Sequence, residues 1–510
     1  MMTRAVPTAE RRDALSVLAA ASDEPNRVAL VVGDREFSFR ELGERVERAM
    51  EWLIREANAD PVQPRVSSDD PRRPVALIGQ SDLGTLVILY ALIEMGRPAA
   101  LIHPRLTERE RAPVVALVAP EIVLGDDAPA RLDAFTPQRQ PSSETKELPS
   151  ERAARVLDPE SCLAVLFTSG TTGEPKGVML SRRAFEASAR ASEQNLGFYE
   201  DDRWLLGLPI AHVGGLSILT RCLIARRTVV VPPEVAAGQR LSAAGLVRVI
   251  QDARVTLLSL VPTQLEWLLA HEPPFTPPPR LRAVLLGGAA ARASLLERAG
   301  SRGVPVLTTY GLTEACSQVT TETHGTKKPD SSHDRGSGAP MVGTDVRVVG
   351  GVIAVRGPTL FSGYVTRRNG VSHPLDADGF FQTDDLGRLD ANGRLHVVGR
   401  RSDTIITGGE NVYPAEVEAI LETCPGVAAA CVFGVPDDTW GQIVAVAIVP
   451  SEAGFLRSRF EAFVAANLAS HRRPRQMVLA TALAVTPAGK LDRRETARST
   501  EARLRPFPLV

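Results

Sequence analysis

A segment rich in glycine and hydroxyl side chains limits the possible folds of this chain more than any other feature. Residues 168–177 read TSGTTGEPKG and directly follow an apolar run at 163–167. Glycines allow backbone conformations in which several N–H groups converge on one point, and the hydroxyls add further donors. Because Lys176 adds positive charge, the segment is suited to bind phosphate. It predicts a buried strand that leads into an anion-binding loop.

The spacing within this segment differs from that of a Walker A loop. Pro175 stands five positions after Gly170, and Lys176 is followed by Gly177 in place of serine or threonine. A P-loop nucleotide hydrolase is therefore a weak interpretation. Taken alone, the segment could equally be a surface loop enriched in turn-forming residues.

The composition is typical of a globular protein that binds small molecules. With 510 residues, the chain is long enough for about three structural units. A formal net charge of −1 argues against bulk attraction to nucleic acid or anionic membranes. The five cysteines are scattered and form no C-x-x-C pair, which fits a reducing compartment. Since the apolar stretch at 83–95 is too short to cross a bilayer and no signal peptide is visible, we expect a cytoplasmic protein without a transmembrane segment. Peripheral contact with a membrane stays open.

Short apolar runs alternate with helical stretches over most of the chain, which is typical of an α/β fold. One such block covers the first 125 residues, and a second covers residues 161–307. Each block predicts a parallel sheet with helices packed on it. In the first block, Ser38 and Asp82 are predicted helix N-caps and Gly96 is a predicted helix stop.

The rest of the chain has a different pattern. Short strands and turns at 343–400, with a predicted hairpin at 346–355, indicate a small β-barrel-like subdomain. A last α+β module begins near Arg401. We therefore expect a large N-terminal domain at residues 1–400, made of two parallel-sheet subdomains and the β-barrel-like one. A smaller, mobile C-terminal domain is expected at residues 401–510.

Six further motifs follow the loop along the chain. They are Gly287-Gly288-Ala289, Tyr310-Gly311-Leu312-Thr313-Glu314, Thr383-Asp384-Asp385, Gly399-Arg400, Gly408-Gly409-Glu410-Asn411 and Gly489-Lys490. The first two lie at the ends of predicted strands, and open α/β sheets bind ligands at the carboxyl ends of their strands. With these motifs in this order, residues 25–495 resemble the adenylate-forming superfamily, which contains acyl-CoA synthetases, adenylation domains and luciferases.

The resemblance implies a two-step reaction. A carboxylate is a poor electrophile, and its attack on the α-phosphate of ATP converts it to an acyl adenylate with release of pyrophosphate. A thiol then displaces AMP. Both steps place negative charge on phosphate or carbonyl oxygens, so the site needs cations and fixed N–H dipoles and no nucleophilic side chain. The implied cofactors are ATP, Mg²⁺ and coenzyme A.

The resemblance also implies which residues bind the nucleotide. Asp385 and Arg400 would hold the ribose hydroxyls, and Glu314 would bind Mg²⁺, which prefers carboxylate oxygen. Lys490 would bridge the carboxylate and the α-phosphate, and Thr313 would contact phosphate. The resemblance assigns nucleotide binding to three further groups of residues. The phosphate loop contributes Thr168, Ser169, Gly170, Thr171, Thr172, Gly173 and Lys176. The backbone of Gly287, Gly288 and Ala289 would pass the adenylate, and Tyr310, followed by Gly311, would lie against the adenine.

In the C-terminal module, Gly408 and Gly409 match the loop that lines the thiol channel after this module rotates, a hinge motion. The hinge is expected at residues 400–403, where Ser402 occupies a place that is often Asp or Lys in the superfamily. Asp384 stands where the superfamily usually has glycine. That departure leaves the local loop geometry open.

The stretch at 208–217 indicates the substrate class. Amino-acid-activating members of the superfamily have an aspartate here, and this chain has none. His212 matches the CoA ligases, where it lies near the reacting carboxylate and counts among the catalytic residues. The expected substrate pocket contains His212, Arg221, Gly288 and Ser317.

Runs at 212–219, 310–318 and 400–416 are similar to those of the o-succinylbenzoate–CoA ligases of menaquinone biosynthesis. This similarity implies an aromatic dicarboxylate as substrate. Arg221, a cation in an apolar stretch, would then face the second carboxylate or have a structural role.

A basic run in the C-terminal module contains Arg472, Arg473 and Arg475. These arginines could contact the phosphates of CoA or form a solvated surface.

Alternative functions remain open from the sequence. A related acyl-CoA synthetase with another acid, a free-standing adenylation enzyme that loads a carrier protein, and a nucleotide-binding protein without catalysis all fit these motifs. A zinc protease is excluded because His271-Glu272 lacks a second histidine, and a serine hydrolase is excluded because the run at 215–219 lacks the last glycine of a nucleophile elbow. The expected partners are a small carboxylic acid and CoA, without nucleic acid, and a homodimer stays open.

Overall fold

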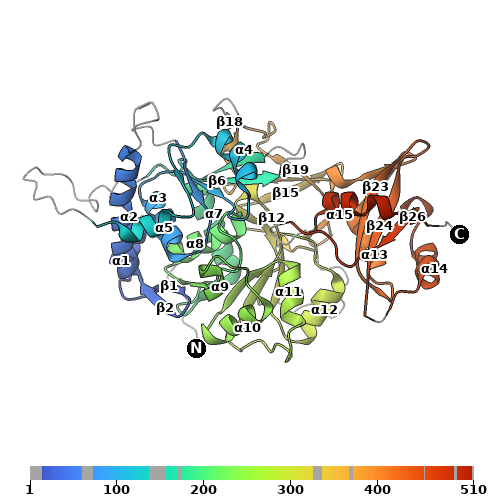
Figure 1. Ribbon diagram of the computed structural model, residues 1–510, viewed down its shortest axis with the longest axis horizontal. Coiled ribbons are helices and arrows are strands. Elements are labelled where there is room, and N and C mark those ends of the chain that lie inside the picture. The colour runs from blue at the N-terminus through green and yellow to red at the C-terminus, as the bar shows by residue number, and fades with distance from the viewer. Residues whose placement is uncertain are drawn as a thin grey trace, which may run out of the picture.

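Two large β-sheets, with helices between and around them, form the body of the protein (Figure 1). The computed structural model describes residues 14–59, 73–136, 157–169, 175–325, 336–366, 371–452, 454–486 and 491–507. Within these ranges, no helix is both long and apolar enough to cross a lipid bilayer.

The first sheet has seven strands in the order β18-β17-β7-β6-β4-β3-β5. The four strands from β6 to β5 run parallel, and the other three are antiparallel. The strands β3 and β4 are apolar throughout and buried, as parallel strands covered on both faces must be. In chain order the strands are β3 (Val75–Ile78), β4 (Ala99–Ile102), β5 (Val123–Leu124), β6 (Cys162–Ser169), β7 (Pro175–Ser181), β17 (Gly363–Val365) and β18 (Val371–Ser372).

The second sheet has nine strands in the order β14-β13-β12-β11-β10-β8-β9-β1-β2. Its central strands, from β12 to β1, run parallel, and antiparallel strands form both edges. In chain order the strands are β1 (Val28–Val32), β2 (Arg35–Ser38), β8 (Arg203–Leu205), β9 (Thr228–Val231), β10 (Leu257–Leu260), β11 (Ala283–Leu286), β12 (Val306–Leu312), β13 (Ser317–Thr321) and β14 (Ala339–Pro340).

The first strand, β1, lies in the nine-stranded sheet, where it pairs in parallel with β9. The next strands along the chain, β3 and β4, belong to the seven-stranded sheet. The expectation that the first 125 residues form one sheet is therefore wrong. Hydrophobic periodicity identifies a strand, but its neighbour in the sheet is decided by packing between distant parts of the chain.

Two helices fill the space between the sheets. Helix α7 (Arg182–Leu196) contacts β7 of one sheet and β13 of the other, and helix α8 (Val213–Ala225) contacts β9 and β13. A single hydrophobic core consequently includes residues of both sheets. The other helices of the body are α1 (Val17–Asp23), α2 (Phe39–Ala59), α3 (Leu83–Glu94), α4 (Glu108–Val118), α5 (Ala128–Ala134), α9 (Pro233–Ala236), α10 (Ala243–Asp252), α11 (Pro262–Leu269) and α12 (Ala293–Ser301).

The helix ends predicted from sequence are confirmed. The Asp82 carboxylate accepts a hydrogen bond from the backbone N–H of Thr85 at the start of α3. Ser38 and Glu41 exchange side-chain and backbone hydrogen bonds at the start of α2. Gly96, with a φ of +66°, follows the last turn of α3, where a left-handed residue stops a helix.

The expected β-barrel-like subdomain is a four-stranded antiparallel sheet in the order β15-β16-β19-β20. Its first two strands form the predicted hairpin, and Gly350 and Gly351 supply the positive φ angles of its turn. The strands are β15 (Asp345–Val349), β16 (Val352–Arg356), β19 (Phe381–Leu389) and β20 (Leu395–Arg400).

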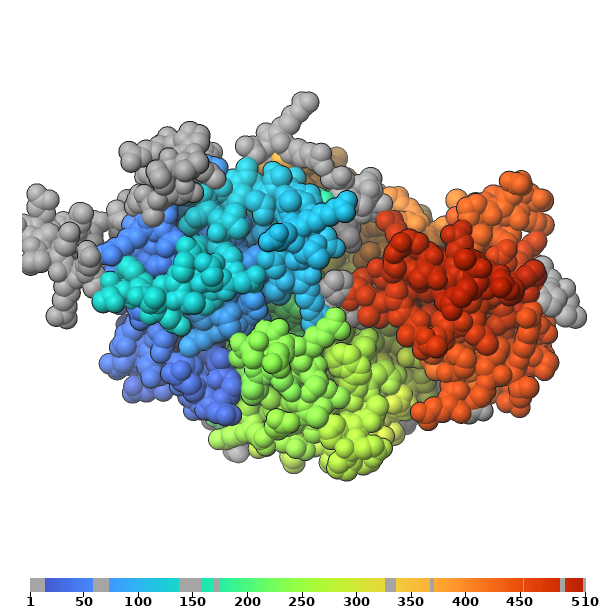
Figure 2. Space-filling view, viewed as in Figure 1, coloured from blue at the N-terminus to red at the C-terminus, as the bar shows by residue number. Residues whose placement is uncertain are grey.

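The C-terminal module has its own sheet and its own hydrophobic core, and it lies at one end of the molecule (Figure 2). The 3₁₀ turn η3 (Arg401–Asp403) connects it to β20. Arg292 of the body donates a hydrogen bond to the Ala428 carbonyl across the contact between the two parts, at 2.5 Å. The elements are β21 (Ile405–Thr407), β22 (Glu410–Val412), α13 (Pro414–Leu421), β23 (Val427–Asp437), β24 (Gly441–Pro450), α14 (Arg457–Asn467), β25 (Gln476–Leu479), α15 (Arg493–Thr500) and β26 (Arg505–Pro506).

Candidate active site

Several predicted site residues gather at the carboxyl ends of two neighbouring parallel strands. Strand β11 ends just before Gly287, and β12, which pairs with it, carries Tyr310 near its own end. A Cβ atom on Gly287 would lie 2.8 Å from Cγ2 of Thr309, so only glycine lets the strand ends approach this closely. Thr313 and Glu314 follow in the 3₁₀ turn η2 (Thr313–Ala315).

The other predicted glycines beside these strands differ in their surroundings. A Cβ on Gly311 would lie 1.9 Å from the Ser317 carbonyl oxygen, which excludes any side chain there. Gly288 has a φ of +81° and, like Ala289, is exposed. Backbone is therefore accessible at Gly288 and Ala289, as close contact with a ligand requires.

Tyr310, Asp385 and Arg400 form a contiguous chain of contacts. The Tyr310 hydroxyl donates to Oδ2 of Asp385 at 2.7 Å, and Nε of Arg400 lies 3.3 Å from Oδ1 of the same carboxylate. The β19–β20 register places Asp385 directly opposite Arg400. Burial, and then the negative charge of Asp385, raise the pKa of Tyr310, so the phenol stays protonated and donates. The arrangement joins an aromatic face, a carboxylate and an exposed guanidinium, which suit a nucleoside.

Asp384, which departs from the glycine of the superfamily, reaches toward the connection between the two modules. Its carboxylate lies 3.7 Å from Nε of Arg401, the first residue of η3, and both side chains are partly exposed. Asp385 keeps its contacts beside this acid. The substitution therefore adds a surface ion pair next to the contacts of Asp385 with Tyr310 and Arg400.

The predicted phosphate loop connects two antiparallel strands. Thr168 at the end of β6 lies opposite Lys176 at the start of β7, and Ser169 lies opposite Pro175. The described parts of β6 and β7 therefore end opposite each other, at the two positions that flank the loop. The remaining predicted residues, Gly170, Thr171, Thr172, Gly173 and Lys490, lie outside the described part of the chain.

Glu314 is held by a tyrosine that sequence reasoning did not identify. The Tyr364 hydroxyl donates to Oε1 of Glu314 at 2.8 Å, and Nζ of Lys176 lies 5.3 Å from the centre of the same ring. No cluster of three or more acidic, histidine or cysteine side chains able to hold a metal is found in the described ranges. A single carboxylate fits Mg²⁺, which keeps several waters and takes its other ligands from substrate phosphates.

Two histidines meet where the two large sheets face each other. His212 is the N-cap residue of α8, and His103 follows β4; their ring centres are 5.0 Å apart. Burial, with a smaller effect of the Arg105 charge, lowers the pKa of His103 to about 4, so this ring is neutral. Its Nε2 atom is buried and has no hydrogen-bond partner among the described residues. His103 was missed because a lone histidine after a strand carries no motif.

Arg221 is a buried cation. It is 2 % exposed, and its Nη2 donates to Oγ of Ser188 at 3.1 Å. Burial lowers the pKa of its guanidinium to about 10, which leaves it charged at neutral pH. No carboxylate among the described residues pairs with it. Burying a charge without a partner is unfavourable, so we expect either that a bound anion pairs with Arg221 or that its hydrogen bonds support the local structure.

Arg221 is connected to the predicted pocket residue Ser317. Ser188, which accepts its hydrogen bond, donates to the carbonyl of Cys316 at 2.8 Å. Cys316 and Ser317 have φ angles of +49° and +95°, in the region that non-glycine residues avoid. The arginine is therefore connected to a strained turn that follows η2, two residues after Glu314.

The predicted thiol-channel loop packs against an exposed tryptophan. A Cβ on Gly408 would lie 2.6 Å from the Trp440 ring, and the Arg475 guanidinium lies 4.2 Å from the ring centre. Of the other two arginines considered for CoA, Arg472 pairs with Glu416, and Arg473 donates to the carbonyls of Ala465 and Leu468, which precede it in the chain. Arg473 therefore has a structural role, and Arg475 is the cation beside the loop.

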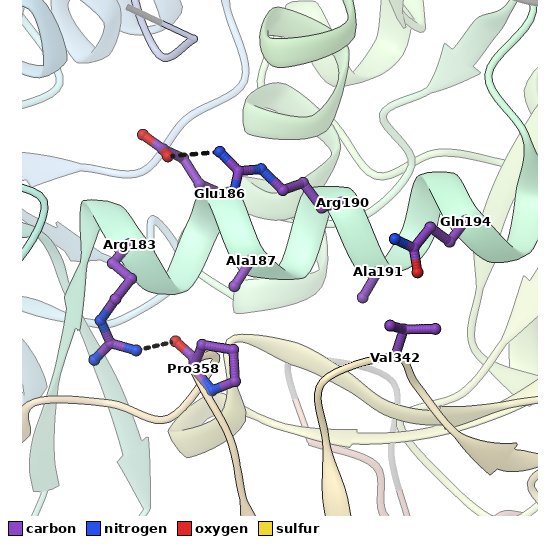
Figure 3. A pocket seen from close by; sticks show the side chains of 8 residues that line it. All are labelled: Arg183, Glu186, Ala187, Arg190, Ala191, Gln194, Val342 and Pro358. Atoms are coloured by element: carbon purple, nitrogen blue, oxygen red, sulfur yellow. Dashed lines mark hydrogen bonds and ion pairs between the residues drawn. The ribbon is translucent and has the colours of Figure 1, made fainter. Parts of the chain in front are cut away.

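A separate shallow pocket, of about 370 Å³, lies between α7 and the loops that carry Val342 and Pro358 (Figure 3). Its floor is apolar, and Arg183 and Arg190 at its rim are tied to Pro358 and Glu186. None of the predicted site residues lines it. It is not part of the candidate active site.

Family models and relatives agree with this geometry. Residues 17–365 match the model of AMP-binding enzymes, and residues 416–490 match the model of the AMP-binding enzyme C-terminal domain. A 2-succinylbenzoate–CoA ligase of Bacillus cereus is 33% identical over 94% of this chain and 96% of its own length.

Solved structures agree as well. The o-succinylbenzoate CoA synthetase of Bacillus subtilis, bound to its acyl-adenylate intermediate, superposes with a TM-score of 0.80 at 28% identity, over 94% of this chain and 97% of that one. The same enzyme with ATP and magnesium gives a TM-score of 0.77 at 28% identity, over 94% and 98%. The α/β architecture expected from the sequence, with a smaller C-terminal module, is confirmed. The chain belongs to the family of AMP-binding enzymes.

Proposed function

We propose that this protein is an acid–thiol ligase that uses ATP to adenylate a carboxylic acid and then transfers the acyl group to CoA. The observation that carries the proposal is the set of contacts among Tyr310, Asp385 and Arg400, because Tyr310 lies on β12, the strand that leads to Glu314. An aromatic face, a ribose-binding carboxylate and a metal-binding carboxylate are what an adenylate requires. The substrate we propose is o-succinylbenzoate, because the relatives that match nearly the full chain bear that activity in their names.

Each described residue has a defined task in this reaction. Tyr310 would lie against the adenine, and Asp385 would accept both ribose hydroxyls while Arg400 fixes its orientation. Lys176 would bring positive charge to the departing pyrophosphate. Glu314 would hold Mg²⁺, whose charge offsets that of the phosphates when it is bound. The two histidines would border the acyl group, with His212 next to the reacting carboxylate.

A second carboxylate on the substrate would complete the environment of Arg221. The guanidinium is buried and charged, and no anion of the described chain meets it. o-Succinylbenzoate carries two carboxylates, only one of which is activated. We infer that the other lies near Arg221, on the far side of the Cys316–Ser317 turn.

The two half-reactions would use two positions of the C-terminal module. In one position Lys490 reaches the α-phosphate, and in the other Gly408 and Gly409 line the path of the thiol. We place the domain boundary between residues 400 and 401 and the hinge within 400–403, where β20 ends and η3 begins. Since ATP and CoA are cytoplasmic metabolites, we infer that the enzyme works in the cytoplasm.

One set of assays tests the proposal. Mass spectrometry of products from a panel of aromatic and aliphatic acids, with ATP and CoA, should show o-succinylbenzoyl-CoA as the preferred product. Carboxylate-dependent exchange of pyrophosphate into ATP should be present in the wild type and abolished in Lys490→Ala. If a CoA thioester formed only from another acid, the proposed substrate would be wrong. If the acyl group were transferred only to a carrier protein, the proposed acceptor would be wrong. If no pyrophosphate exchange occurred, the proposed reaction would be wrong.

A further inference from the structure

Tyr364 lies between two residues of the proposed nucleotide site that belong to different parts of the chain. Its hydroxyl donates to Oε1 of Glu314 at 2.8 Å, and the face of its ring receives Nζ of Lys176 at 5.3 Å from the centre. One side chain thus contacts both the carboxylate expected to bind the metal and the lysine expected to bind the phosphates.

The sheet register explains how this contact arises. Strand β17 pairs antiparallel with β7, and Tyr364 lies opposite Val178. Side chains two residues apart on a strand share a face, so Lys176 is the diagonal neighbour of Tyr364, within reach of a long side chain. The ring is fixed from the other side by Phe361, whose ring centre is 4.8 Å away in an edge-on arrangement.

Glu314 is held at both ends by this segment. Its backbone carbonyl accepts from the N–H of Phe361 at 2.8 Å, and its carboxylate accepts from Tyr364. Burial, and then the charge of Glu314, raise the pKa of Tyr364, so the phenol remains a donor at any physiological pH. The contact occupies Oε1 and leaves Oε2 as the oxygen that can bind a cation.

Tyr364 contacts two opposite charges, one through its ring and one through its hydroxyl. Lys176 and Glu314 form no ion pair in the described structure, although both contact the same side chain. A direct pair would neutralise the lysine needed by the phosphates and the carboxylate needed by the metal. On an aromatic face the lysine ammonium keeps its full positive charge, and it is held there by a weak electrostatic attraction to the ring.

We propose that Tyr364 is a positioning residue that orients Glu314 for Mg²⁺ and holds Lys176 apart from it. The proposal rests on the proposed function, because it takes Glu314 as the metal ligand and Lys176 as a phosphate ligand. Residues that hold a metal ligand in place typically change metal affinity 10- to 100-fold when they are removed.

Direct metal binding tests this role. Mn²⁺ is titrated into the full-length enzyme with a non-hydrolysable ATP analogue, and free Mn²⁺ is followed by electron paramagnetic resonance. Tyr364→Phe, which removes only the hydroxyl, should weaken Mn²⁺ binding at least about 10-fold. Tyr364→Leu, which also removes the ring face, should in addition weaken binding of the analogue measured without metal. Tyr199→Phe, whose ring stacks on Arg282 away from the site, is the matched control and should change neither.

A double-mutant cycle with Glu314→Gln separates positioning from general stability. If Tyr364 acts through Glu314, Tyr364→Phe should have no further effect on Mn²⁺ binding in the Glu314→Gln background. Unchanged Mn²⁺ affinity in Tyr364→Phe, with a lower free energy of unfolding, would show a structural tyrosine and overturn the proposal. A wild type that binds no Mn²⁺–nucleotide and catalyses no pyrophosphate exchange would instead refute the proposed function itself.

Discussion

Arg493 and Asp403 form an ion pair, with 2.6 Å between Nη1 and Oδ2, that joins helix α15 to the turn between the two modules. The same guanidinium meets both oxygens of Glu418 on α13 at 2.9 Å. Helix α15 begins three residues after Lys490. The start of α15 is therefore fixed to the hinge segment and to the core of the C-terminal module.

Replacing Arg493 with methionine should destabilise the C-terminal module strongly. It would leave Glu418 buried without its partner, and breaking such a pair lowers the free energy of unfolding by roughly 3–5 kcal/mol. Urea unfolding followed by circular dichroism measures the change. Arg498→Met is the control, because Arg498 pairs with Glu495 on the surface, where solvent screens the ion pair, and its loss should change the free energy of unfolding far less. Equal effects of the two variants would contradict the structural role of Arg493.

Asp385→Asn should weaken AMP binding by about 10- to 100-fold, the range expected for losing hydrogen bonds to a charged group. The change removes the negative charge that faces Arg400 and the proposed ribose hydroxyls. Isothermal titration with AMP measures it. The neighbouring change Asp384→Gly restores the residue usual in the superfamily and breaks only the surface contact with Arg401, so it should leave AMP affinity intact.

Arg221→Met should change substrate preference more than overall activity. The monoacid benzoylpropionate, which lacks the ring carboxylate of o-succinylbenzoate, provides the comparison. We expect kcat/KM for the diacid to fall on the order of 100-fold, and kcat/KM for the monoacid to fall much less, since a buried charge pair is lost only with the diacid. Equal losses for both acids would mean that Arg221 only supports the Cys316–Ser317 turn.

Gly408→Ala should separate the two half-reactions. The methyl group of alanine would collide with the Trp440 ring, and the alanine backbone would have to adopt a φ of +58°. Pyrophosphate exchange, which does not need the thiol, should persist, while formation of the CoA thioester should fall at least about 10-fold. Gly409→Ala, whose Cβ would meet nothing within 4 Å, tests whether the collision or the backbone angle is responsible. A parallel loss of exchange would argue against a role confined to the thiol step.

His103 should make the fold sensitive to acid. The unfolded chain binds a proton at a pKa near 6.5, whereas the folded protein, with a pKa of about 4, does so only at lower pH. Between these values the unfolded state holds more protons, so the free energy of unfolding falls as pH falls. Between pH 6.5 and pH 4, the free energy of unfolding should fall less for His103→Gln than for the wild type. Urea unfolding at several pH values measures the difference. Parallel curves for the two proteins would show that His103 does not cause the effect.

The sequence was sufficient for features that depend on neighbouring residues. The cap at Asp82, the stop at Gly96 and the hairpin around Gly350 each follow from the conformational preferences of one or two residues, and the structure confirms them. The Asp385–Arg400 contact could be expected only through the resemblance to a known superfamily, because the two residues meet through strand pairing.

Other features could not be predicted because they depend on distant contacts. Tyr364 reaches Glu314 only because β17 pairs with β7, far away in the sequence. His103 meets His212 only because the two large sheets face each other. Neither residue stands in a motif, and no periodicity of a single segment encodes a neighbour in another sheet.

The pairing of β1 with β9 bears on how the enzyme folds during synthesis. Leu30 lies beside Val229, so the first strand leaves the ribosome long before its partner exists. At roughly 5–20 residues per second, on the order of ten seconds or more pass between the synthesis of β1 and that of β9. The N-terminal part therefore cannot complete its sheet as a nascent fragment. Late closure of the nine-stranded sheet follows from this topology.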